Sequence, residues 1–135
     1  MSNSVTPRGE RRFALVLFGA SGFTGKLVAE YLAKLGRTDL AWAIAGRNQA
    51  KLEDVRRELA RIDPRLGELP ILIADSSDKT ALRSIAEQTR VVCTTVGPYA
   101  KYGLPLVEVC AEAGTDCCDL TGEVQFVRRS IDSAH

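Results

Sequence analysis

Five short apolar runs alternate along the chain with segments in which apolar residues recur every three or four positions. A continuous apolar run of strand length is typical of a parallel strand that is covered on both faces. Parallel neighbours need crossover connections, so the alternation predicts a three-layered α/β fold with a Rossmann-like, doubly wound parallel sheet. The runs expected to form its strands are Phe13–Gly19, Leu40–Gly46, Pro70–Asp75, Arg90–Gly97 and Asp116–Leu120.

The helices expected between these strands have recognisable ends. Gly36 is placed to cap the first helix at its C-terminus, and Asn48 to cap the second at its N-terminus. In the fourth helix Pro105 stands near the first helical position and Gly114 at the C-cap. The apolar positions that predict the core-facing side of the first helix are Leu27, Val28, Tyr31, Leu32 and Leu35.

The turn between the first strand and the first helix contains three glycines, Gly19, Gly22 and Gly25. A helix N-terminus has free N–H groups and a partial positive charge, and glycine lets an anion come close to them. In a dinucleotide-binding turn the first glycine permits the tight turn, the second the approach of the pyrophosphate, and the third the packing of helix on strand. The spacing is GxxGxxG rather than the commoner GxGxxG, and a glycine-rich turn without a ligand is the alternative. The residues expected to contact the cofactor here are Gly19, Ala20, Ser21, Gly22, Phe23, Thr24 and Gly25.

Arg47 follows the second strand at the position that distinguishes between dinucleotides. An NAD-binding unit usually ends this strand with Asp or Glu on the ribose 2′-hydroxyl, whereas this chain has Gly46 followed by Arg47. A guanidinium in this place can hold a 2′-phosphate, which predicts NADP(H) as the cofactor. The alternative is a solvated surface arginine at a helix start, where a cation is electrostatically unfavourable.

Two further segments follow predicted strands at the carboxyl edge of the sheet, where such sheets bind ligands. Asp75 ends the third strand, and we expect its carboxylate to accept a hydrogen bond from the adenine amino group. The alternative is a helix-start residue ahead of Ser77 or Asp78. The stretch Val96, Gly97, Pro98 and Tyr99 ends the fourth strand and is expected to contact the cofactor, with Gly97 and Pro98 on the nicotinamide-ribose side.

The residues near the reacting end do not assign a catalytic group. Tyr99, Lys101 and Tyr102 are expected there, but neither tyrosine has a lysine four positions later, as a short-chain dehydrogenase would require. The single histidine, His135, is the last residue. Glu123 follows the fifth strand and is either a proton-handling group or an acidic residue in the first turn of a helix.

Composition and charge exclude several other classes of protein. Eighteen basic and seventeen acidic side chains leave a net charge of +1, which gives no electrostatic case for a nucleic-acid or anionic membrane partner.

The chain has neither a signal peptide nor a run long enough to span a membrane, so we expect a cytoplasmic protein. Residues 1–12 are expected to form a disordered polar tail, and residues 13–135 one dinucleotide-binding domain. The four cysteines lack a CxxC or Cys/His pattern, so we expect reduced core residues and no metal site.

Four stretches, FGASGFTGKL, AGRN, TTVGPYAKYGLPLVEVCAEAGTDCCDLTGE and SIDSAH, follow one another from about Phe13 to the end. In them the chain resembles the saccharopine dehydrogenase-like oxidoreductases, and most closely their trans-acting enoyl reductase branch. The resemblance implies an NADP-binding Rossmann domain at the front of a longer enzyme, with a substrate domain behind it and with this portion inactive alone. It also implies reduction of an enoyl double bond on polyketide-derived chains during lipid biosynthesis, in trans to a polyketide synthase. The cofactor contacts that carry over are Gly19, Gly22, Gly25, Arg47 and the turn at Val96–Tyr99.

Two other functions are compatible with the same residues. A non-catalytic dinucleotide sensor of the atypical short-chain dehydrogenase type shares the GxxGxxG turn and lacks the Tyr/Lys pair. A scaffold that has lost its ligand is the third possibility. Binding of NADP(H) separates the scaffold from the other two, and a substrate domain with polar groups converging on the nicotinamide separates the enzyme from the sensor.

Overall fold

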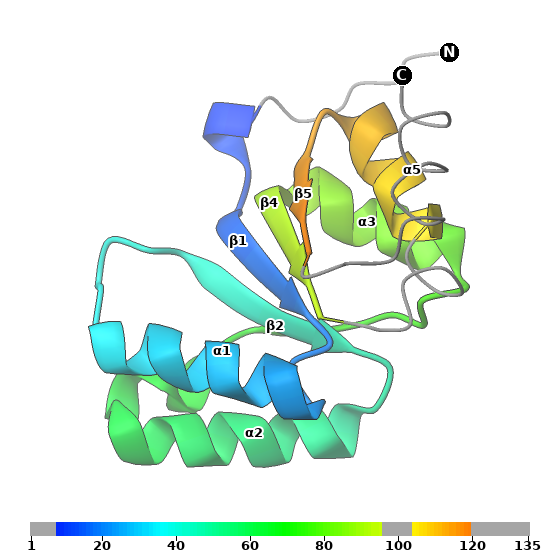
Figure 1. The fold of residues 1–135 in the computed structure, drawn as a ribbon. Coiled ribbons are helices and arrows are strands. Elements are labelled where there is room, and N and C mark those ends of the chain that lie inside the picture. The colour runs from blue at the N-terminus through cyan, green and yellow to red at the C-terminus, as the bar shows by residue number, and fades with distance from the viewer. Residues whose placement is uncertain (1–7, 96–103, 120–135) are drawn as a thin grey trace.

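Five parallel strands form one sheet in the order β3-β2-β1-β4-β5 (Figure 1). The structure, a computed structural model, describes residues 8–95 and 104–119. The strands are β1 (Phe13–Phe18), β2 (Trp42–Gly46), β3 (Ile71–Ile73), β4 (Thr89–Thr94) and β5 (Asp116–Cys118). The helices are α1 (Phe23–Leu35), α2 (Gln49–Ile62), α3 (Lys79–Gln88) and α5 (Leu104–Ala113), and two 3-10 turns, η1 (Arg8–Glu10) and η2 (Pro64–Glu68), precede β1 and β3.

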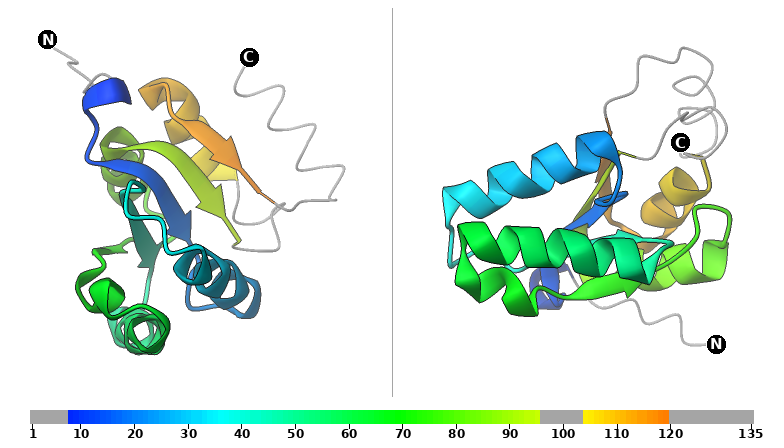
Figure 2. Two further views of the ribbon diagram at one scale, coloured as in Figure 1. Left: turned by 90° about the vertical axis from the view of Figure 1, so that its left-hand side faces the viewer. Right: turned by 90° about the horizontal axis from the view of Figure 1, so that it is seen from below.

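Helices cover both faces of the sheet (Figures 1 and 2). The helices α1 and α2 pack side by side on one face, and α3 and α5 pack together on the other. Alternate side chains of β1 point to opposite faces of the sheet. Leu17 packs in the core under α1 and α2, whereas Val16 and Phe18 pack in the core under α3 and α5. This three-layered, doubly wound sheet is the fold that the alternation of strand and helix patterns predicts.

All five predicted strands are present, with ends that differ from the apolar runs by a few residues, and the predicted helix caps are confirmed. Gly36 adopts a left-handed conformation (φ 62°) and donates its N–H to the carbonyl of Ala33. Asn48 precedes α2, and its side chain accepts a hydrogen bond from the backbone N–H of Lys51 at 3.1 Å. Local sequence therefore determines where these two helices end and begin.

The predicted core-facing side of α1 is only partly correct. Val28 and Leu32 do pack against the core, but Leu27, Tyr31 and Leu35 are exposed. The fully buried positions of α1 are instead three small residues, Gly25, Ala29 and Ala33. Small side chains let the helix axis lie close to β1 and β2, and the larger apolar residues at neighbouring helical positions are then left outside.

Arg11 ties the segment before β1 to the ends of α3 and α5, at the same edge of the sheet, where Phe13 pairs with Thr89. Its guanidinium donates to the carbonyls of Thr89 (2.8 Å), Ala86 (3.3 Å) and Ala113 (2.5 Å), and to the hydroxyl of Thr115 (2.5 Å). Thr115 is itself buried and donates onward to the carbonyl of Ala86. Arg11 thus satisfies carbonyls near the C-terminal ends of both α3 and α5. Residues 8–12 belong to the folded structure rather than to a disordered tail.

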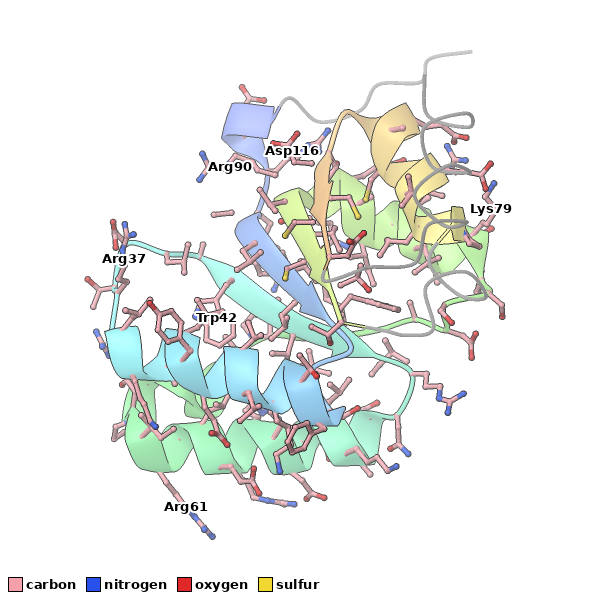
Figure 3. The ribbon with its side chains drawn as sticks, in the orientation of Figure 1. Arg37, Trp42, Arg61, Lys79, Arg90 and Asp116 are labelled. Carbon is pink, nitrogen blue, oxygen red and sulfur yellow. The ribbon has the colours of Figure 1, made fainter. Side chains whose placement is uncertain are left out.

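We expect Arg11→Met to lower the free energy of unfolding by about 2–4 kcal/mol, because several charge-assisted hydrogen bonds to acceptors on buried residues are lost together. Arg61→Met is the matched control, since Arg61 extends from α2 away from the fold (Figure 3). Urea titration of both variants provides the measurement. Equal stability of the two variants would show that the Arg11 contacts contribute nothing.

The four cysteines are all free thiols in the structure. Cys110 is buried, Cys93 and Cys117 are half-buried, and Cys118 is exposed, so the expectation of core residues is wrong for Cys118. Burial, and next the neighbouring Cys118, raises the pKa of the Cys93 thiol to about 12. A hydrogen bond with Cys110, followed by burial, raises the pKa of Cys117. Within residues 8–95 and 104–119, no cluster of His, Cys, Asp and Glu side chains is arranged to hold a metal ion.

At pH 8 we expect iodoacetamide to modify Cys118 at least tenfold faster than Cys93. With its pKa raised to about 12, the Cys93 thiol is ionised in only about one molecule in ten thousand at this pH, and the thiolate is the reactive form. Peptide mapping by mass spectrometry after timed alkylation reports both rates. Similar rates at the two positions would contradict the assigned environments.

Candidate cofactor-binding site

The centre of the sheet contains the point at which a doubly wound fold binds ligands. Strands β1 and β4 are neighbours, with Phe18 in register with Thr94, so their carboxyl ends are level. The chain continues from β1 into α1 on one face, whereas α5, which comes after β4 in the chain, lies on the other. Ligands of such sheets bind in the crevice outside the carboxyl ends at this switch of direction. The glycine turn that follows β1 lies at this position.

Hydrogen bonds to β2 and β4 hold the turn after β1. Gly19, whose φ of 90° suits glycine, donates its N–H to the carbonyl of Ala45 at 2.8 Å. From the end of β4, the hydroxyl of Thr95 donates to the carbonyls of Gly19 (3.2 Å) and Phe18 (3.3 Å). Sequence reasoning did not identify Thr95, because its role depends on β4 lying beside β1. The sequence places Thr95 inside the predicted strand Arg90–Gly97, and its membership of the stretch TTVGPYAKYG that carries the family resemblance is the available signal.

Gly25 is required by packing within the protein. A Cβ atom at this position would lie 2.1 Å from the carbonyl oxygen of Gly19 and 2.8 Å from the Cα of Ala20. Both are backbone atoms and cannot turn aside as a flexible side chain could. The first turn of α1 therefore lies directly against the end of β1.

Gly22 is under neither constraint. Its φ and ψ of −78° and 170° are open to any residue, and an added Cβ would meet only the carbonyl oxygen of Gly19, at 3.4 Å. Gly22 is also exposed, on the outer side of the turn. Neither backbone conformation nor packing accounts for glycine here, and the remaining explanation is a partner that approaches this backbone from outside.

No side chain accepts a hydrogen bond from the N–H groups in the first turn of α1, so these groups are available to such a partner. Gly22 is the N-cap and no side chain caps the helix, whereas Asn48 caps α2 and Asp78 caps α3 through their side chains. The first turn of α1 also lacks an acidic residue. Unpaired N–H groups and the positive end of the helix dipole together favour an anion.

The remaining residues predicted in the turn differ in what they can offer a ligand. Ala20 is fully buried and packs in the core, so only its backbone is available. Ser21 is half-buried, and Thr24 is exposed beside Gly22. Phe23 is 84% exposed at the start of α1.

Arg47 and Asp75 lie on neighbouring strand ends at the same edge of the sheet. Gly46 pairs with Ile73, and the N–H of Ala74 donates to the carbonyl of Gly46 at 2.9 Å, so the residues that follow emerge side by side. Arg47 is exposed and extends the site along the edge from the glycine turn.

The carboxylate of Asp75 is oriented by Ser77. Its Oδ1 accepts hydrogen bonds from the hydroxyl of Ser77 at 2.7 Å and from the backbone N–H of Ser77 at 2.9 Å. These bonds, with a smaller contribution from the charge of Arg47, lower the pKa of Asp75. The N-cap of α3 is Asp78, so Asp75 does not cap that helix. An ionised carboxylate in a fixed direction is thus placed beside Arg47.

Several predicted positions lie outside the described residues. They are Val96, Gly97, Pro98, Tyr99, Lys101, Tyr102, Glu123 and His135.

The order of the strands, the glycine turn at the switch point and the uncapped helix define the class: a dinucleotide-binding domain of the Rossmann type. The chain belongs to the family described as the saccharopine dehydrogenase NADP binding domain, whose model matches residues 15–133. NADP is therefore its cofactor.

Curated relatives include a trans-acting enoyl reductase of Mycobacterium tuberculosis (strain H37Rv), 51% identical over 126 residues, and one of Mycobacterium leprae, 48% identical over 126 residues. Both alignments cover 93% of this chain and 29% of the relative. The chain thus spans less than a third of the length of these proteins.

Solved structures with the same fold include apo saccharopine dehydrogenase (L-Glu forming) of Saccharomyces cerevisiae. It has a TM-score of 0.66 and 20% identity, over 86% of this chain and 23% of that chain. A short-chain dehydrogenase/reductase of Veillonella parvula in complex with NADP has a TM-score of 0.60 and 14% identity, over 90% of this chain and 63% of that chain. At these identities the likeness concerns the fold.

Proposed function

We propose that this chain is the cofactor domain of an NADPH-dependent enoyl reductase that acts on polyketide-derived lipid chains carried by a synthase in trans. The observation that carries the cofactor part of the proposal is the exposed, unconstrained Gly22 at the uncapped start of α1. The enoyl reductase part is supported by 51% identity to proteins named trans-acting enoyl reductases. The proposal includes a cytoplasmic location for the protein. In the described part of the chain, no helix has the length and apolar character needed to cross a membrane.

Each residue of the site has a proposed task. The backbone of the turn from Gly19 to Gly25 receives the pyrophosphate, with the N–H groups at the start of α1 donating to it. Arg47 pairs with the 2′-phosphate, and Asp75 accepts from the adenine amino group. Thr95 holds the turn in shape through the carbonyls of Phe18 and Gly19. The segment Val96–Tyr99 lines the nicotinamide-ribose side.

Bound NADPH supplies a hydride, and reduction of an enoyl group adds this hydride and one proton across the carbon–carbon double bond. The described residues of this chain bind and orient the cofactor. We propose that the groups that bind the enoyl chain and supply the proton come from the additional length that the mycobacterial relatives possess. This chain alone is then expected to bind NADPH without turnover.

The test uses the product of the complete reading frame that contains this chain. We expect it to consume NADPH when an α,β-unsaturated thioester is present and not with the matching saturated thioester. Consumption with an imine but not with an enoyl thioester would assign a different acceptor. Saturable NADPH binding with no consumption on either acceptor would favour the sensor and overturn the enzyme proposal.

A further inference from the structure

Four large apolar side chains form a stripe along the outer side of α1. They are Phe23, Leu27, Tyr31 and Leu35, at intervals of four residues, and their exposed fractions are 84%, 53%, 64% and 48%. We call this set the outer stripe. It starts beside the glycine turn and runs the length of the helix.

Val28 and Leu32, which are half-buried and pack against the core, connect the outer stripe to the buried side of α1, so the helix is apolar around most of its circumference. The outer stripe itself lies opposite the fully buried positions. At about 100° per residue, its mean direction lies roughly 180° from that of the buried positions Gly25, Ala29 and Ala33. A helix that is apolar on opposite sides is normally covered on both. The neighbouring α2 shows the contrast, because it buries Leu52, Val55 and Leu59 and carries mainly charged side chains on its exposed positions.

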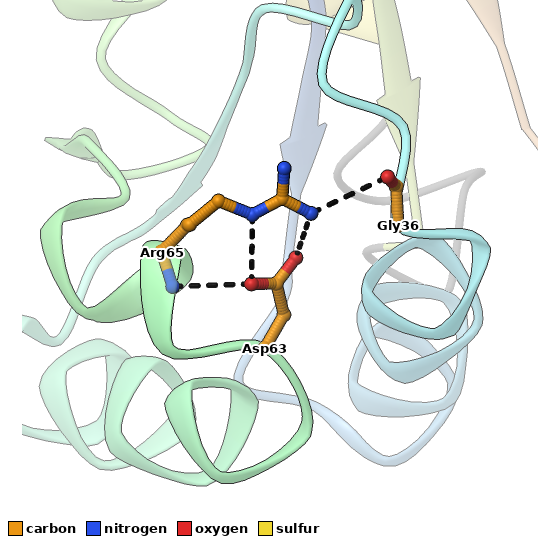
Figure 4. A network of polar contacts seen from close by, with 3 residues as sticks. All are labelled: Gly36, Asp63 and Arg65. Atoms are coloured by element: carbon orange, nitrogen blue, oxygen red, sulfur yellow. Dashed lines mark hydrogen bonds and ion pairs between the residues drawn. The ribbon is translucent and has the colours of Figure 1, made fainter.

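Contacts with the layer beside it hold α1 in this orientation. Near its start, Nζ of Lys26 lies 3.1 Å from a carboxylate oxygen of Glu58 on α2. At the end of α1, the carbonyl of Gly36 accepts a hydrogen bond from the Arg65 guanidinium at 3.4 Å (Figure 4). Two nitrogens of this guanidinium donate to the carboxylate of Asp63, which fixes its position. The close approach of Gly25 to Gly19 also prevents α1 from rotating to bury the outer stripe.

The size of the outer stripe indicates what covers it. With aromatic side chains of about 150–250 Å² each, the stripe exposes roughly 400–500 Å². A standard interface between separate proteins needs about 800 Å² on each partner, so the stripe is small for two free copies of this chain. A partner on the same polypeptide needs less area, because the linkage gives an effective concentration on the order of millimolar.

We propose that the outer stripe is the docking surface for the remainder of a longer polypeptide, the portion that accounts for the other 71% of the mycobacterial relatives, since their match to this chain covers 29%. Because Phe23 stands beside Gly22, the docked portion borders the cofactor turn. The inference depends on the exposed stripe and the lengths of the relatives, and not on which acceptor is reduced.

Hydroxyl-radical footprinting without cofactor tests the proposal, and it requires no substitution that could unfold the protein. The 135-residue chain is compared with the product of the complete reading frame, and oxidation of Phe23, Leu27, Tyr31 and Leu35 is followed by mass spectrometry. We expect at least a fivefold slower oxidation of these side chains in the longer protein. Ile62 and Ile73, which are 40% and 46% exposed on other elements, serve as internal controls and are expected to keep their rates.

Unchanged rates at the outer stripe, or a reading frame with no further domain, would overturn the proposal. Protection that appears in the 135-residue chain and grows with concentration would assign the stripe to a second copy and also overturn it. Because cofactor is absent from the experiment, these outcomes are independent of NADPH binding and of turnover. Failure of the enzyme proposal therefore leaves this test valid.

Discussion

Replacing Gly22 with alanine is expected to weaken NADPH binding roughly 10- to 150-fold and to leave the free energy of unfolding within about 1 kcal/mol of the wild-type value. The loss of affinity corresponds to one charge-assisted hydrogen bond to the pyrophosphate. The fold should tolerate the change, because the backbone of Gly22 is extended and the new Cβ meets only one atom, at 3.4 Å. A lower entropy of the unfolded chain and a poorer N-cap act in opposite directions.

Calorimetric titration with NADPH and urea unfolding of the same preparation provide both quantities. Gly67→Ala is the matched control, since Gly67 lies in η2 and an added Cβ would meet the Cβ of Ala60 at 3.8 Å. We expect the control to bind NADPH as the wild type does. If Gly22→Ala bound NADPH with unchanged affinity, the pyrophosphate would not approach at this position.

Gly25→Ala, in contrast to Gly22→Ala, is expected to act mainly by lowering the stability of the fold. The new Cβ would lie 2.1 Å from the carbonyl oxygen of Gly19, so α1 must move away from β1 or the turn must change shape. Overpacking of this kind typically costs about 1–3 kcal/mol. Because the atoms that the new Cβ would meet are backbone atoms of Gly19 and Ala20, we expect a cost at the upper end of this range or above it. The better helix propensity of alanine, worth about 1 kcal/mol, offsets only part of that cost.

We therefore expect Gly25→Ala to lower the thermal midpoint by roughly 5–10 °C and to weaken NADPH binding as a consequence of the displaced helix. Differential scanning calorimetry of Gly25→Ala beside Gly67→Ala measures the effect. A thermal midpoint for Gly25→Ala that equals that of the control would mean that α1 and β1 are not in close contact. The pair Gly22 and Gly25 thus separates loss of ligand binding from loss of packing within one turn.

The features that the sequence predicts well are those decided by neighbouring residues. The strand, turn and helix around Gly19–Gly25 follow from an apolar run, glycines and a helical spacing that are contiguous in the chain. The helix ends at Gly36 and Asn48 likewise depend on local capping.

The features that the sequence does not predict depend on contacts between distant residues. Thr95 reaches the carbonyl of Gly19 across 76 positions, and Arg11 reaches that of Ala113 across 102. Arg11 belongs to no motif, and Thr95 belongs to a stretch that carries the family resemblance without showing its partner. Each contact exists only because the sheet order brings the two segments together. A polar residue at a strand end or before a strand does not by itself reveal such a partner.

The sequence pattern predicts the buried face of α1 only in part, for a different reason. Ala29 and Ala33, like Leu27 and Tyr31, satisfy helical spacing, and the larger side chains bury more apolar area and so were expected in the core. The structure instead buries the small ones, because Gly25 brings the helix close to the sheet. The spacing between two elements is a tertiary property, and the hydrophobic pattern of one helix does not contain it.

The most direct test of the cofactor site is the ratio of NADPH to NADH affinity, measured by calorimetry for the wild-type chain and for Arg47→Glu. With Arg47 on the 2′-phosphate, the wild type is predicted to prefer NADPH roughly 10- to 150-fold, and Arg47→Glu to lose that preference and keep NADH binding. Equal affinity of the wild type for both dinucleotides, or an unchanged ratio in Arg47→Glu, would contradict the assignment.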